Sequence, residues 1–103
     1  MSTYNKIYET LNATGLPCAY SHFATPQTPP YVVYIGRGQN VMEADNTHYW
    51  KENQYQVEYY YTVKDESKED LLETALLSAG YLYEKSDDLY LDDEKVYMIV
   101  YYI

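Results

Sequence analysis

The sequence predicts one α+β domain over residues 1–103, with a mostly antiparallel sheet and two helices packed on one face. The strongest observation is residues 54–63, where tyrosines and valines alternate with mostly polar residues, as in a strand with one buried face. Two other segments have the spacing of amphipathic helices. Strand-like runs outnumber these helices, and most of them are joined as hairpins.

The first half of the chain predicts one helix and two strands. Ser2 or Thr3 begins the helix, Gly15 ends it, and its apolar stripe consists of Tyr4, Ile7, Tyr8 and Leu11. Residues 18–23 form a first strand, and the proline-rich residues 25–30 form an extended loop. Residues 31–35 form a second strand that is apolar on both faces. Residues 36–53 then form a long arm, which we expect to be irregular apart from a short strand near residues 47–50.

The second half begins with the returning limb of this arm, whose core face is expected to hold Tyr55, Val57, Tyr59, Tyr61 and Val63. The second helix begins at Ser67, with a capping box to Asp70, and Gly80 ends it. Its expected buried stripe is Leu71, Leu72, Ala75, Leu76 and Ala79. Short strands at 82–85 and 89–91 precede a final strand at 95–103. That strand is apolar on both faces, so we expect it near the centre of the sheet.

Composition limits the classes of function. The chain has 7 basic and 16 acidic residues and a net charge of −9, which argues against duplex DNA or an anionic membrane as a partner. No segment approaches the roughly 20 apolar residues that span a bilayer, and we expect no secretory signal. A single cysteine excludes an internal disulfide and fits a reducing compartment. The 16 tyrosines fit either an interface or the half-buried edges of a small sheet.

No residue pattern predicts catalysis, a metal site or a cofactor. Cys18 and His22 share one face of a strand, but a third metal ligand is not evident and nothing orients a catalytic base. The glycine-rich residues 36–40 lack the Lys-Ser/Thr of a phosphate-binding loop. The acidic turns at 87–88 and 92–94 lack the ligand alternation of a calcium loop and indicate a solvated surface. We therefore predict a protein that is not an enzyme and has no cofactor.

Several residues are candidates for contacts between subunits. Arg37 is the chain's only arginine, and it fits either an exposed solubilising charge or an ion pair across an interface, which its planar guanidinium suits. Trp50, beside Tyr49 in the arm, fits either a core residue or an interface anchor. Tyr60 is an aromatic residue on the polar face of its strand. The full candidate set is Arg37, Asn40, Tyr49, Trp50 and Tyr60.

Taken together, five stretches resemble a family of small proteins encoded among the head–tail joining and tail genes of phages and prophages of Gram-positive bacteria. The stretches are GLPCAY (15–20), PPYVVY (29–34), ADNTHY (44–49), YQVEYY (55–60) and YEKS (83–86). The resemblance runs over nearly the whole chain and consists of strand and turn residues. It implies a structural virion protein similar to tail terminator and tail completion proteins, which form rings, often of six copies, at the head-proximal end of the tail.

The resemblance also implies partners and a location. The partners would be copies of the chain itself and the tail-tube and neck proteins, with no sequence-specific nucleic acid and no membrane. The location would be the virion, and the bacterial host cytoplasm during assembly. The arm would reach a neighbouring subunit, and the acidic surface would let DNA pass without binding it. Adaptor, stopper and tube roles stay open.

A different class of function is an acidic phage-encoded inhibitor, a DNA mimic that binds a host protein. Carboxylates spaced along one face would favour it, whereas most carboxylates here fall in turns and at a helix start. An enzyme is a third class, which no pattern in the sequence favours.

Overall fold

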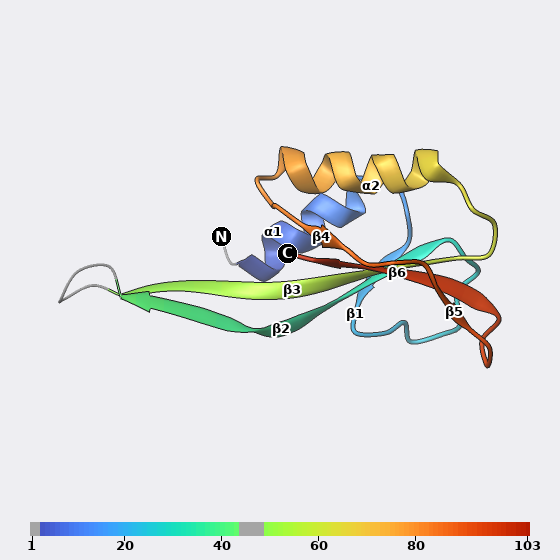
Figure 1. Cartoon of the computed structure of the whole chain (residues 1–103), viewed down its shortest axis with the longest axis horizontal. Helices are drawn as coiled ribbons and strands as arrows, with labels where there is room; N and C mark the ends of the chain where they lie inside the picture. Colours follow the sequence, from blue (N-terminus) through green and yellow to red (C-terminus); the bar gives the residue numbers. More distant parts are fainter. Residues whose placement is uncertain (1–2, 44–48) are drawn as a thin grey trace.

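The computed structural model describes residues 3–43 and 49–103, and the side chains of residues 6–39 and 53–103. It has the predicted α+β fold, in which two helices cover one face of a six-stranded, mostly antiparallel sheet (Figure 1). The strand order is β1-β2-β3-β6-β4, and β5 also pairs with β6. The elements are α1 (Thr3–Asn12), β1 (Cys18–Tyr20), β2 (Tyr31–Glu43), β3 (Tyr49–Tyr61), α2 (Glu66–Ser78), β4 (Glu84–Lys85), β5 (Leu89–Leu91) and β6 (Val96–Tyr102).

β3 supplies the centre of the core, because alternate side chains over its residues 55–61 face the helices. Four of these side chains are at most 7% exposed: Tyr55, Val57, Tyr59 and Tyr61. They pack with buried residues of both neighbouring strands and both helices: Val32, Tyr34, Ile99, Tyr101, Ile7, Leu11, Leu72 and Leu76. The predicted core face is confirmed except at Val63, which is 78% exposed because β3 ends at Tyr61 and the chain turns away.

α2 differs from its prediction at its start and in its buried stripe. Asp65 is the N-cap, and its carboxylate accepts a hydrogen bond from the Ser67 amide at 3.0 Å, so the predicted start at Ser67 was wrong. Leu72 and Leu76 are buried as predicted, but Leu71 is exposed. The position three residues before Leu72 is taken by Glu69, which is 2% exposed. Compared with the prediction, the buried stripe of α2 is therefore rotated around the helix axis, so that it includes the carboxylate of Glu69 in place of Leu71.

The arm is a regular two-stranded ribbon and not the irregular excursion that we predicted (Figure 1). β2 and β3 keep pairing from Gly38↔Gln54 to Glu43↔Tyr49. The glycine-rich interruption is absorbed as a register shift between Gly36 and Gly38, with Gly38 at a φ of +116° that favours glycine. Residues 44–48, which include the first half of the predicted short strand, lie outside the described residues, and its second half belongs to β3.

The ribbon extends beyond the rest of the sheet. β1 pairs with β2 only at residues 32–34, and the backbone pairing of β3 with the last strand ends where Tyr55 meets Ile103. The molecule measures 51 × 27 × 26 Å, and its radius of gyration is 15.0 Å. A compact chain of this length has a radius of gyration of about 13 Å. The fold is therefore elongated along the direction in which the ribbon projects.

β5 has the predicted bounds, and β1, β4 and β6 are shorter than predicted. β6 lies between β3 and the β4–β5 edge, which confirms the near-central place expected for the last strand. β1 ends at Tyr20, because Ser21 takes a φ of 68° and the chain leaves the sheet. No helix in the part of the chain that the structure describes is long and apolar enough to cross a membrane.

Neighbouring leucines of α2 test the placement of its buried stripe. Leu76 is fully buried and Leu77 is 52% exposed. We expect Leu76→Ala to lower the free energy of unfolding by about 2–5 kcal/mol through lost burial and a cavity. Leu77→Ala should change it by about 0.5 kcal/mol or less. Urea unfolding followed by circular dichroism measures both, and equal losses would contradict the placement of the helix.

Candidate functional site

The face of the sheet opposite the helices carries a block of aromatic, apolar and polar side chains. Here we call it the outer face. It consists of three rows across β2, β3 and β6: Ile35, Gln56 and Tyr102; Val33, Glu58 and Val100; Tyr31, Tyr60 and Met98. Val33 and Val100 are at most 5% exposed, and most of their neighbours are half-buried. This composition is more apolar than that of a sheet face that only meets water.

Aromatic rings gather in the last row of the outer face. The Tyr31 and Tyr60 rings stack with centroids 4.9 Å apart and an interplanar angle of 22°. Phe23, from the segment between β1 and β2, meets Tyr31 edge-on at 5.4 Å. Such pairs add to the stability of a site beyond the area that they bury. The rings therefore form a rigid aromatic wall at this end of the sheet.

Glu58 fixes the position of the Tyr60 ring. The Tyr60 hydroxyl donates to Glu58 Oε1 at 2.7 Å, and Gln56 Nε2 donates to Glu58 Oε2 at 2.7 Å. Burial raises the pKa of Tyr60, and the hydrogen bond to Glu58 and the charges of Glu58 and Glu94 raise it further. Burial and then Glu94 also raise the pKa of Tyr31. Both phenols therefore stay neutral at physiological pH.

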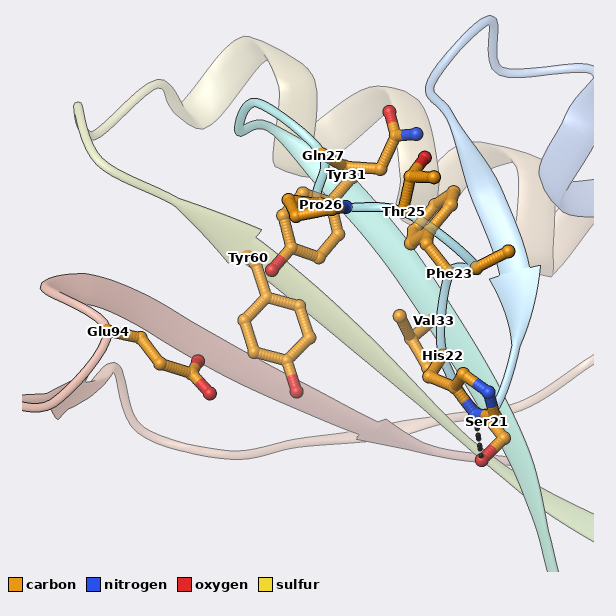
Figure 2. A pocket seen from close by; sticks show the side chains of 11 residues that line it. Ser21, His22, Phe23, Thr25, Pro26, Gln27, Tyr31, Val33, Tyr60 and Glu94 are labelled. Carbon is orange, nitrogen blue, oxygen red and sulfur yellow. Dashed lines mark hydrogen bonds between the residues drawn. The ribbon is translucent and has the colours of Figure 1, made fainter.

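A pocket of about 450 Å³ opens beside these rings, and we call it the aromatic pocket (Figure 2). Tyr31, Val33 and Tyr60 line it from the sheet, and the segment of residues 21–27 lines it from the other side. Glu94, from the turn before β6, stands at its edge with its carboxylate directed toward the Tyr60 ring. Glu94 is the only acidic residue of the lining, which contains no lysine and no arginine among the described residues.

The predicted interface residues do not gather in one place. Tyr60 lines the aromatic pocket. Arg37 lies at the base of the ribbon, where its Nε donates to the Tyr55 carbonyl at 3.3 Å and its guanidinium sits 5.3 Å from the centre of the Tyr102 ring. Asn40, Tyr49 and Trp50 belong to the strands of the ribbon, and their side chains lie outside the described part.

The pocket brings together residues that the sequence did not single out. Phe23, Tyr31 and Glu94 come from three separate parts of the chain. Tyr31, Val33 and Ile35 occupy every second position of a strand, which predicts that their side chains share one face. No comparable signal exists for Glu94, which reads only as part of an acidic turn. Its place depends on how the last hairpin packs.

A cluster of charged side chains lies on the helix side of the sheet, and we call it the ionic cluster. Lys64 pairs with Glu69 at 2.7 Å and with Asp88 at 2.9 Å. Lys85 pairs with Glu69 and with Glu73, each at 2.9 Å. Glu69 is buried, so its two lysine partners offset the cost of removing its charge from water. The cluster joins α2 to the segments around β4.

Tyrosine hydroxyls complete the ionic cluster. Tyr101 donates to Glu73 at 2.7 Å, Tyr83 donates to Glu73 at 3.2 Å, and Tyr61 donates to Asp88. Burial by itself would raise the pKa of Glu73, but the hydrogen bonds from Lys85 and Tyr101 outweigh it and lower that pKa. Because these groups are paired with one another, we interpret the cluster as a structural anchor for α2.

Cys18 and His22, which were considered for metal or nucleophilic chemistry, do not share a strand, because β1 ends at Tyr20. Burial raises the pKa of the Cys18 thiol, which favours its protonated, less reactive form. His22 is exposed, and its Nδ1 lies 3.3 Å from the Ser21 hydroxyl. His48 lies outside the described residues. Within residues 3–43 and 49–103, no group of three or more His, Cys, Asp or Glu residues is placed to hold a metal ion.

Comparison with protein-family models and with curated protein sequences finds no match to this chain.

The lowered pKa of Glu73 predicts a loss of stability in acid. A carboxyl group whose pKa is lower in the folded chain stabilises the fold above its unfolded pKa, and this contribution disappears as the pH falls through the folded pKa. Between about pH 5 and pH 3, we therefore expect the unfolding free energy of the wild type to fall more steeply than that of Glu73→Gln. Urea unfolding at a series of pH values measures this slope.

Asp70→Asn serves as the control for this prediction, because Asp70 is an exposed carboxylate on the same helix. Its slope should match that of the wild type. Parallel curves for the wild type and Glu73→Gln would contradict the stabilising role of the charged carboxylate.

Proposed function

We propose that this chain is a structural component of a phage or prophage virion, a tail terminator, tail completion or head–tail joining protein that assembles as a ring. The single observation that carries the proposal is the two-stranded ribbon that projects beyond the sheet. It adds to the family resemblance of the sequence, and it bears on assembly in three ways.

The two strands of the ribbon pair only with each other among the described residues. An isolated two-stranded hairpin is marginally stable in water, and a third strand or a packed face is required. Beyond Gly38↔Gln54, β2 and β3 have no further strand beside them among the described residues. A neighbouring subunit that covers the ribbon would supply the missing contacts.

The residues of the ribbon suit an interface. Its sequence contains Val41, Met42, Tyr49 and Trp50 beside charged residues such as Lys51 and Glu52. Aromatic residues and methionine are enriched where proteins meet, and tryptophan is a frequent anchor. This composition supports a ribbon that is partly buried by another chain.

A projecting arm also favours a ring. When each copy places its arm on a different patch of the next copy, the contact is heterologous, and it closes into a ring where the rotation allows. The net charge of −9 fits a ring around a DNA conduit, because an acidic wall does not retain phosphates. Tail-tube and neck proteins are then the partners on either side of the ring.

Removal of the ribbon tests the proposal. A variant in which Asn-Gly replaces residues 39–53 joins β2 to β3 by a tight hairpin turn at the Gly38↔Gln54 pair. We expect the full chain to form oligomers at rising concentration, alone or with a tail-tube protein of the same phage, and the variant to stay monomeric. Sedimentation velocity measures the oligomers, and urea unfolding shows that the shortened monomer is folded.

Single substitutions provide a matched control for this experiment. Trp50→Ser should weaken the oligomer and Lys51→Ser should not, because tryptophan supplies a large apolar contact. A full chain that stays monomeric, alone and with tail-tube protein, would contradict the proposal. An oligomer that forms equally well without the ribbon would contradict the role given to the ribbon.

A further inference from the structure

The chain repeatedly places its own cations over tyrosine rings. Lys6 lies over Tyr81, Arg37 over Tyr102, Lys64 over Tyr61 and Lys85 over Tyr101, at 4.8 to 5.8 Å from the ring centres. The stacked Tyr31–Tyr60 pair differs from these rings. No lysine or arginine among the described side chains lies over either of its rings.

Glu94 gives this aromatic pair a negative charge without a counter-ion. It is exposed, and within the described side chains it forms no ion pair. Its carboxylate points toward Tyr60 in the aromatic pocket (Figure 2). Glu58 accepts the Tyr60 hydroxyl hydrogen bond and adds a second carboxylate close to the rings. An aromatic face beside an unpaired carboxylate attracts a cation through both groups.

We propose that the aromatic pocket binds an arginine side chain presented by an extended segment of another protein. A guanidinium stacks flat on an aromatic ring and donates two parallel hydrogen bonds to a carboxylate, which a lysine ammonium does not do. The polar side chains of Ser21, Thr25 and Gln27 on the opposite wall suit the backbone of the incoming segment. A volume of about 450 Å³ accommodates one long side chain and its adjoining backbone.

The arginine comes from a different protein and not from a second copy of this chain. Arg37 is the only arginine of the sequence, and it is already engaged with Tyr102 and with the Tyr55 carbonyl. This inference does not depend on the ribbon or on ring assembly.

Titration with short peptides tests the proposal in the folded full-length chain. The probes are Ac-Gly-Arg-Gly-NH2 and the same peptide with citrulline, the neutral analogue of arginine, followed by NMR chemical shifts. We expect the arginine peptide to shift the amides of residues 21–27 and the ring signals of Tyr31 and Tyr60, with millimolar affinity. The citrulline peptide should bind more weakly, because it lacks the charge.

Two variants locate the interaction. Glu94→Gln should weaken binding of the arginine peptide about two- to fivefold, the size expected for an exposed ion pair. Glu9→Gln removes the same charge from an exposed position on α1, on the other side of the sheet, and should leave the affinity unchanged. Unchanged shifts elsewhere in the spectrum show that both variants are folded.

Four results would overturn the proposal. These are an absence of shifts, shifts that map outside the aromatic pocket, equal binding of the arginine and citrulline peptides, and equal effects of the two glutamate substitutions. None of them bears on the oligomers expected from the ribbon, because the peptide titration is read from residues that the ribbon does not include.

Discussion

The register of β3 is the constraint on which the rest of the structure depends. It sets Tyr55, Val57, Tyr59 and Tyr61 against the helices, and Gln56, Glu58 and Tyr60 on the outer face. β2 and β6 pair with β3 on its two sides, so their side chains are divided between the helix-covered face and the outer face in the same way. If the pairing of β3 slipped by one residue, Glu58 would be buried and Tyr55, Tyr59 and Tyr61 would be exposed. The core, the aromatic pocket and the base of the ribbon are therefore all fixed by one strand alternation.

The chain combines many tyrosines with many carboxylates, and the structure relates the two. A tyrosine packs its ring like an apolar side chain, while its hydroxyl needs a polar partner when it is buried. The hydroxyls of Tyr101, Tyr61 and Tyr60 donate hydrogen bonds to the carboxylates of Glu73, Asp88 and Glu58, respectively. Much of the tyrosine content is thus explained within the fold, and several rings that sequence composition left open to an interface belong to the core. The Tyr31–Tyr60 pair remains as a surface with an unpaired charge beside it.

The sequence predicts an element correctly where the pattern within one segment determines its structure. The predictions fail where residues elsewhere in the chain determine which side chains are buried. The alternation at 54–63 and the apolar last strand predict the α+β sheet and the central place of β6. The stripe of α2 was misplaced because the burial of Glu69 depends on Lys64 and Lys85, from outside that helix. The ribbon was predicted to be irregular because glycines usually end a strand, whereas here they form a bulge within it. The sequence did not predict the aromatic pocket, because Glu94 and Phe23 belong to no common sequence pattern.

Hydrogen–deuterium exchange of the ribbon's backbone amides can show whether the ribbon is an interface between subunits, as we propose. The measurement compares the amides of residues 39–43 and 49–53 in a dilute sample with those in a concentrated sample that includes tail-tube protein. Backbone groups at the edges of a two-stranded ribbon exchange readily when only water covers them. We expect slower exchange of these amides at high concentration, with the amides of the β3–β6 ladder unchanged. Equal exchange of the ribbon amides in the two samples would contradict the claim.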